Sequence, residues 1–167
     1  MSQNLRRYSL KSKEAKHVLV QASEKLKTNL ETIYGSKANV EVVETGFGDL
    51  LLLGGKPLLF RASGLVLPML LASELTSKLP KAVVDMGAIK FVCNGADIMA
   101  PGIVRYEGEF QKGDVIVVVD VTHGKPLAIG ETLYDAEEAR KTKKGAAIKN
   151  RHYVGDKLWN AAKSLAQ

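Results

Sequence analysis

The most restrictive feature of the sequence is a run of β-branched residues at 114–121, which reads DVIVVVDV. Such residues favour extended backbone, and a nearly uninterrupted run is typical of a strand buried on one or both faces. Turn sequences flank it at 111–113 (QKG) and 123–125 (HGK). Further strands are expected at 103–106, 127–133, 146–148 and 153–154. Short strands separated by glycine turns predict a closed or nearly closed β-barrel.

The first 80 residues predict a different arrangement, a small α+β domain. Ser12 is expected to cap a helix over 12–34, because apolar residues recur there at helical spacing, and Gly35 is expected to stop it. Pro68 suits the first turn of a second helix, over 68–78. Strands are expected at 39–44, 50–53 and 57–61, the last two joined by a Gly54-Gly55 turn.

The boundary between the two parts is expected at Leu79-Pro80, since proline disfavours helix at the residue before it. The sequence therefore predicts an α+β protein with an N-terminal domain at 1–79, a β-barrel domain at 80–160 and a C-terminal tail at 161–167.

Two short helices are expected within the barrel domain. Asp85 can cap a helix over 87–93, and Gly95 can take the left-handed conformation that ends it. Asp135 and Glu138 resemble an acidic capping box before the second helix.

Composition excludes several classes of protein. With 46% hydrophobic and 25% charged residues, the 167-residue chain can bury a core. No apolar run reaches the roughly 18 residues of a membrane span, and the N-terminus lacks the apolar region of a secretory signal. Cys93 is the single cysteine, so no internal disulfide can form. A cytoplasmic protein with no membrane contact is expected.

Charge points to a polyanionic partner. The chain carries a net charge of +6 and its basic residues cluster. One cluster contains Arg6, Arg7, Lys11, Lys13 and Lys16, and a second contains Arg140, Lys141, Lys143, Lys144, Lys149 and Arg151. Clustered like charges repel one another unless a polyanion such as a phosphate backbone compensates them. Two ordinary solvated faces are the alternative.

Catalytic, cofactor and metal motifs are not found. Residues 46–48 (GFG) begin like a dinucleotide-binding fingerprint, but the third glycine is missing. His17, His123 and His152 lie far apart, without the spacing of metal ligands. Neither an enzyme, a cofactor nor a metal is expected.

The loop 94–102 (NGADIMAPG) consists largely of small residues. Small side chains leave backbone N–H groups bare, so a phosphate or sugar can approach closely, and Pro101 stiffens the loop. The alternative is that Gly95 and Gly102 only permit tight turns. The residues alone favour neither interpretation.

Four segments in a fixed order resemble the PUA domain, a β-pseudobarrel that binds structured RNA. They are VDMGAIKFV, NGADIMAPGI, KGDVIVVV and a lysine-rich stretch that runs into HYVGDKLW. The resemblance implies that the 94–102 loop, the helix before it and the final strand hold RNA. The RNA-binding residues expected from the resemblance, the loop and the basic stretch are Lys90, Gly95, Ala96, Asp97, Met99, Pro101, Gly102, Arg105, Lys143, Lys144, Lys149, Arg151 and His152.

The whole chain is similar to the archaeal and eukaryotic malignant-T-cell-amplified-sequence protein family. That family also has a basic N-terminal helix, strands before Phe60-Arg61 and the segment matched at 84–92. Its eukaryotic members act on the small ribosomal subunit, with a partner protein. The resemblance implies a non-enzymatic protein that binds tRNA or ribosomal RNA, and contacts the small subunit or a translation-factor partner.

The basic N-terminal residues Arg6, Arg7, Lys11, Lys13 and Lys16 are the expected ribosome contacts. Two alternatives remain open. The chain is an accessory or RNA-targeting subunit of an RNA-modification system, or it is a protein-interaction adaptor.

Overall fold

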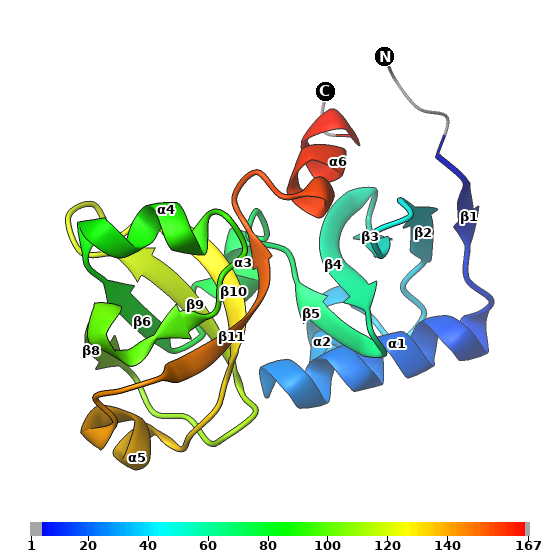
Figure 1. Ribbon diagram of the computed structural model, residues 1–167. Coiled ribbons are helices and arrows are strands. Elements are labelled where there is room, and N and C mark those ends of the chain that lie inside the picture. Colours follow the sequence, from blue (N-terminus) through cyan, green and yellow to red (C-terminus); the bar gives the residue numbers. More distant parts are fainter. Residues whose placement is uncertain (1–4, 166–167) are drawn as a thin grey trace.

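The computed structural model describes residues 5–165 and has two halves, each built on its own sheet (Figure 1). The N-terminal half comprises β1 (Arg7–Ser9), α1 (Ser12–Leu26), α2 (Leu30–Tyr34), β2 (Val40–Glu44), β3 (Asp49–Leu53), β4 (Lys56–Ala62), β5 (Leu65–Pro68) and α3 (Ser73–Thr76). Its five strands form an antiparallel sheet in the order β1-β2-β3-β4-β5. Helix α1 packs beneath this sheet and contacts β5.

The single helix predicted over 12–34 is wrong, because two helices occupy the segment. Lys27, in the left-handed conformation with φ of 55°, ends α1. The Asn29 side chain then accepts a hydrogen bond from the Thr32 N–H and starts α2. Lys11 rather than Ser12 occupies the position before α1, and neither bonds the helix through its side chain. Gly35, with φ of 91°, ends α2 as predicted.

The helix predicted to begin at Pro68 is also wrong. Pro68 ends β5, where it lies opposite Leu59 of β4, and the Met69 N–H continues the ladder to the Leu58 carbonyl. Burial of the apolar strand β5 against β4 and α1 overrides the preference of proline for a helix start. Only the four residues of α3 are helical there.

The C-terminal half forms one curled six-stranded sheet, in the order β7-β11-β10-β9-β6-β8, which confirms the predicted pseudobarrel. Its elements are β6 (Lys81–Val84), η1 (Met86–Ala88), α4 (Ile89–Val92), β7 (Ile98–Met99), η2 (Ala100–Gly102), β8 (Ile103–Glu107), β9 (Val115–Asp120), β10 (Pro126–Thr132), α5 (Ala136–Lys141), β11 (Ala146–Tyr153) and α6 (Lys157–Leu165). β6 and β9 pair in parallel. The strands expected at 146–148 and 153–154 are one strand, β11.

The expected caps of the short helices differ in outcome. Asp85 accepts a hydrogen bond from the Ala88 N–H at 2.9 Å, and Gly95 has a φ of 91°, as predicted. Asp135 precedes α5, but its carboxylate accepts from the Lys112 N–H at 2.8 Å instead of capping that helix. The predicted acidic capping box is therefore wrong.

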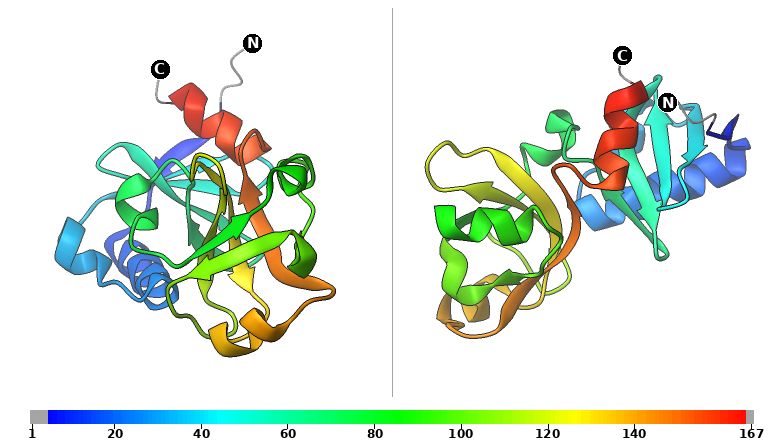
Figure 2. Two further views of the ribbon diagram at one scale, coloured as in Figure 1. Left: turned by 90° about the vertical axis from the view of Figure 1, so that its left-hand side faces the viewer. Right: turned by 45° about the horizontal axis from the view of Figure 1, so that its top comes forward.

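Helix α6 occupies most of the segment expected as a tail. It packs against β4 of the N-terminal half (Figure 2). Leu158 and Ala162 are buried there, in the same cluster as Phe60. The end of the chain thus returns to the first half. None of the helices in residues 5–165 combines the length and the apolar character of a membrane span.

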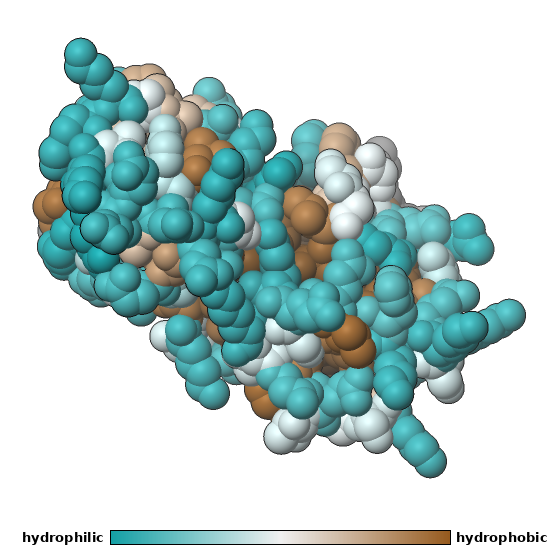
Figure 3. Space-filling view, turned by 90° about the horizontal axis from the view of Figure 1, so that it is seen from below, coloured by the Kyte–Doolittle hydropathy of each residue, from teal (hydrophilic) through white to brown (hydrophobic). Residues whose placement is uncertain are grey.

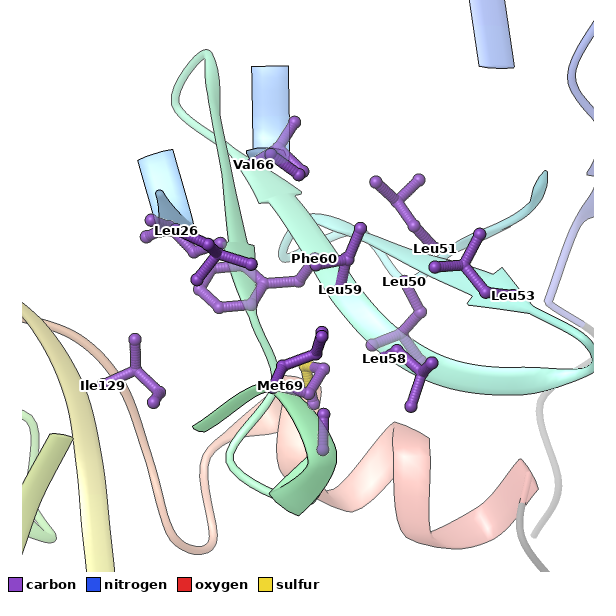
Figure 4. Close-up of a cluster of buried hydrophobic side chains, with 14 of the residues drawn as sticks. Leu26, Leu50, Leu51, Leu53, Leu58, Leu59, Phe60, Val66, Met69 and Ile129 are labelled. Carbon is purple, nitrogen blue, oxygen red and sulfur yellow. The ribbon is translucent and has the colours of Figure 1, made fainter. Parts of the chain in front are cut away.

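Strand β9 is buried on both faces, which explains its continuous β-branched run. Ile116 and Val118 face the interior of the barrel, whereas their neighbours belong to a cluster shared with the N-terminal half. Besides Leu158 and Ala162 of α6, the C-terminal half contributes residues of its sheet to that shared cluster, namely Val83, Val115, Val117, Val119 and Ile129. Ile129 lies on the side of β10 that faces Met69 and Phe60 (Figure 4). A continuous apolar core therefore joins the halves.

Ion pairs reinforce this junction at its edge. Lys25 of α1 lies 2.6 Å from the Glu131 carboxylate of β10 and donates to the Gly113 carbonyl at 2.7 Å. The same carboxylate accepts from Arg151 of β11 at 2.5 Å. Lys27 pairs with Asp114 at 2.7 Å. Both apolar burial and charge thus fix how the two halves sit together.

Candidate nucleic-acid interface

A groove of about 440 Å³ opens on the C-terminal half, between β8, the η2 turn and the end of α5. Figure 2 (left) faces the end of the molecule that carries β8 and α5. The groove is lined by Ala100, Pro101, Ile103, Val104, Arg105, Tyr106, Ala139, Arg140, Thr142 and Lys143. Seen from below, the surface of the molecule is largely hydrophilic, with hydrophobic patches between the hydrophilic side chains (Figure 3).

The groove lining combines apolar and cationic residues. Ile103 and Tyr106 are half-buried, and burial, followed by the nearby Tyr134, raises the pKa of the Tyr106 phenol. Tyr106 is therefore a neutral hydrogen-bonding group at physiological pH. Arg105, Arg140 and Lys143 supply positive charge, and no carboxylate is among the described lining residues. This arrangement suits a ligand with a flat or apolar part and a phosphate.

The two arginines are held by exposed carboxylates outside the groove. Arg105 pairs with Glu107 at 3.1 Å, and Arg140 pairs with Glu109 at 3.0 Å. Exposed ion pairs contribute only about 0–1 kcal/mol. A phosphate group can therefore replace either carboxylate as the partner of its arginine at little cost.

Helix α4 adds exposed residues to the same half. Lys90 lies 5.1 Å from the centre of the Phe91 ring, and Phe91 is 59% exposed. Met99 and Val104 are also about half exposed. Lys90 and Met99 are expected site residues, whereas Phe91 and Val104 were not predicted, because an apolar residue in a helix or strand is usually core. Arg140 is one of the clustered basic residues but is not among the expected RNA contacts.

The 94–102 loop is pinned to β11 by side chains. Asp97 accepts a hydrogen bond from the Asn150 N–H at 3.0 Å and pairs with Lys149 at 3.6 Å. The Asn150 amide donates to the carbonyls of Val92 and Ala96, at 3.0 and 2.9 Å. The loop is therefore held in one shape before any ligand arrives. Asn150 was missed, since an isolated asparagine gives no sequence signal.

The loop glycines have a packing role. A Cβ atom at Gly95 would lie 3.1 Å from the Tyr153 ring, and one at Gly102 would lie 3.3 Å from the Ala88 Cβ. Small residues are thus needed here even without a ligand, so close approach of RNA to the backbone stays a prediction.

We expect Gly95→Ala to cost about 1 kcal/mol more folding free energy than Gly145→Ala. Both positions have positive φ, 91° and 77°, but a Cβ at Gly145 meets nothing within 4 Å. The difference isolates the contact with Tyr153, because the backbone strain is similar in the two variants. Urea unfolding of both proteins gives the comparison. Equal free energies would show that the Tyr153 ring moves aside freely.

Two expected RNA contacts face the junction of the halves instead. His152 is 0% exposed, lies 2.8 Å from the Asp156 carboxylate through Nδ1, and packs against the Phe60 ring. The prediction that the His152 side chain binds RNA is therefore wrong. Arg151 is bonded to Glu131, so its guanidinium is already engaged in the junction.

The remaining expected residues are exposed but dispersed. Pro101, Arg105 and Lys143 meet in the groove, whereas Lys144 and Lys149 lie on the turn before β11 and on β11 itself. The expected ribosome contacts occupy two elements. Arg6 and Arg7 lie at the edge strand β1, and Lys11, Lys13 and Lys16 lie at the start of α1. Arg7 is bonded twice to Glu41, at 2.8 and 3.1 Å.

A curled sheet closed by short helices, with a basic groove beside β8, defines a PUA-type domain joined to a second α+β unit. Residues 80–154 match the family described as the PUA domain. Residues 6–73 match a family described as a domain of unknown function, DUF1947.

Similar proteins match across both halves. Translation machinery-associated protein 20 of Schizosaccharomyces pombe is 36% identical over 151 residues, covering 84% of this chain and 82% of that protein. Human malignant T-cell-amplified sequence 2 is 38% identical over 117 residues, covering 67% of this chain and 65% of that protein. The crystal structure of a hypothetical protein from Pyrococcus horikoshii superposes with a TM-score of 0.78 at 30% identity, covering 94% of this chain and 99% of the other.

The chain therefore belongs to the family of PUA-domain proteins that includes translation machinery-associated protein 20 and the malignant T-cell-amplified sequence proteins.

Proposed function

We propose that this protein binds structured RNA through the groove of its PUA half and acts in translation without catalysing a reaction. The observation that carries the proposal is the groove itself, whose lining brings Arg105, Arg140 and Lys143 together with apolar residues. The family supports it, because the PUA domain is an RNA-binding module and the fission-yeast relative is named for its association with the translation machinery.

The groove offers two kinds of interaction, ionic hydrogen bonds to phosphates and packing against a sugar or base. Arg105 and Arg140 can each hold a phosphate by two parallel hydrogen bonds, and Lys143 adds a point charge. Ile103 and Tyr106 offer a surface for a sugar or base. A helical RNA groove exposes little sequence information to side chains, so shape and backbone contacts dominate recognition.

The RNA is tRNA or ribosomal RNA in this proposal, and the larger partner is the small ribosomal subunit or a translation factor. The exposed lysines at the start of α1 support a contact with such a particle, because they lie on the half that the groove does not use. Sedimentation with purified subunits, comparing wild type with Lys11→Ala/Lys13→Ala/Lys16→Ala, tests that contact.

The groove is tested by the triple variant Arg105→Ala/Arg140→Ala/Lys143→Ala. Each lost phosphate contact flattens the slope of log affinity against log salt by roughly 0.7–0.9, so we expect a total of about two units. Binding of a fluorescent RNA hairpin, measured by anisotropy at several salt concentrations, gives the slope.

Lys141→Ala is the matched control. This residue lies on α5 next to Arg140 but does not line the groove, and its partner is Glu137 at 3.5 Å. We expect the control to bind like wild type. A triple variant that is folded and keeps the wild-type slope would reject the groove as the RNA site.

A further inference from the structure

A second aromatic residue is exposed on the N-terminal half, at a place that the groove does not use. Phe47 stands at the tip of the β2–β3 turn and is 59% exposed. Lys157, the first residue of α6, lies 5.0 Å from the centre of its ring. The two residues are 110 positions apart in sequence, and they meet because α6 packs back onto the first half.

The turn fixes Phe47 in this exposed position. The Thr45 hydroxyl accepts from the Phe47 N–H at 3.1 Å and donates to the Gly48 carbonyl at 2.6 Å. Gly46 and Gly48 have φ of 82° and 132°, which other residues rarely adopt. A Cβ at Gly48 would lie 3.0 Å from the Arg61 carbonyl oxygen, so the turn sits tightly on β4. The backbone that carries the ring therefore has little conformational entropy left to lose when a ligand binds.

The charge around Phe47 favours an anionic ligand. Glu44 is shared by Arg6 and Tyr8, and Asp156 is bonded to His152 and to the Trp159 N–H. These two carboxylates already have partners, whereas Lys157 is exposed and, among residues 5–165, forms no ion pair. A cation over one face of an aromatic ring leaves the other face available for stacking.

We propose that Phe47 and Lys157 form a second RNA contact, in which an unpaired base stacks on Phe47 and its phosphate meets Lys157. The proposal rests on the proposed RNA-binding function and adds a distinct class of ligand, single-stranded RNA next to a structured element. The fully buried core of a protein–protein interface is more apolar than the surface around it. Phe47 instead stands beside glycines and a lysine.

The test compares two fluorescent RNAs that share one hairpin. The first hairpin is blunt, and the second carries about 12 unpaired nucleotides at its 3′ end, a length in the range of single-strand binding sites. We expect wild type to bind the extended RNA at least about fivefold more tightly, because stacking contributes about 1–3 kcal/mol per base. Phe47→Ala should remove that gain and leave the affinity for the blunt hairpin unchanged.

Substitutions of the ring separate stacking from burial. Phe47→Trp should keep the gain, whereas Phe47→Leu, which keeps an apolar side chain but removes the ring, should lose it. Lys157→Ala should reduce the gain and flatten the salt slope for the extended RNA by roughly 0.7. Ile33→Ala, which changes another exposed apolar residue of the same half (49% exposed), is the control and should bind as wild type.

The outcomes distinguish the Phe47–Lys157 contact from the proposed binding of RNA in the groove. The triple groove variant should bind both RNAs more weakly by the same factor, whereas Phe47→Ala should bind only the extended RNA more weakly. Equal binding of both RNAs by wild type, or full retention of the gain by Phe47→Leu, would overturn the Phe47 proposal alone. Failure of wild type to bind either RNA would overturn both proposals.

Discussion

Gly130→Ala is expected to destabilise the protein by about 3–4 kcal/mol. A Cβ at this position would lie 2.3 Å from the Ile148 Cγ2 and 2.8 Å from the Lys149 carbonyl oxygen. The first neighbour is a fully buried side chain and the second is backbone of the adjacent strand, so neither can move without separating β10 from β11. Overpacking of this kind is among the larger costs of a single substitution. Urea unfolding gives the free energy.

Gly87→Ala is the control for Gly130→Ala. A Cβ added at Gly87 would have the Asp85 carboxylate oxygen as its nearest neighbour, at an ordinary contact distance of 3.4 Å. The backbone of Gly87 is not left-handed. We expect a change within about 0.5 kcal/mol. A Gly130→Ala protein within about 1 kcal/mol of wild type would show that the two strands can part cheaply.

The close packing of Gly130 against β11 could not be predicted from the sequence. The register of β10 against β11 shifts between Ile129 and Gly130, so Gly130 lies opposite Asn150 while Ile129 lies opposite His152. Arg151 is the extra residue of this bulge. A single sequence shows neither the register nor the bulge, because both depend on which strands pair.

Much of the local structure was predictable where it depends on the residues themselves. The β-branched run gave β9, and the Gly54-Gly55 turn joins β3 to β4 as expected. The element boundaries that were predicted wrongly depend on contacts with other parts of the fold. Lys27 takes a left-handed conformation that is more common for glycine. Pro68 is the last residue of a strand, because it lies opposite Leu59 in the sheet.

The site was predictable only in part, for the same reason. The resemblance implied Arg105 and the clustered basic residues suggested Lys143, but the groove that brings them together exists because α5 packs beside β8. His152 was expected to contact RNA because the resemblance implied the closing segment as part of the site. Its burial comes from Phe60, a residue of the other half, and no local pattern reports that contact.

Glu131→Gln is expected to destabilise the protein by about 2 kcal/mol at pH 7. The Glu131 side chain is 12% exposed and bonds both Lys25 and Arg151. Removal of its charge leaves two cations facing each other at the junction of the halves. Breaking a fully buried pair costs about 3–5 kcal/mol, and the partial exposure of both cations reduces that figure.

The difference between wild type and Glu131→Gln should also depend on pH. Burial raises the pKa of Glu131, but the hydrogen bonds and charges of Lys25 and Arg151 outweigh burial and hold that pKa below its ordinary value of 4.5. A lowered carboxyl pKa contributes stability that is complete above the unfolded value and is lost as the pH falls through the folded value. The advantage of wild type should therefore be constant above about pH 5 and shrink progressively below about pH 4.5.

Unfolding free energies of both proteins between neutral and acidic pH test this expectation. The carboxyl pKa of Asp156 is lowered as well, but its effect is common to both proteins and cancels in the difference. Glu137→Gln is the control, since Glu137 is 87% exposed and pairs only with Lys141 at 3.5 Å. It should match wild type at every pH. A wild-type advantage that does not change down to pH 3 would show that the charge of Glu131 does not hold the halves together, and that the shared apolar core and the Lys27–Asp114 pair set their arrangement without it.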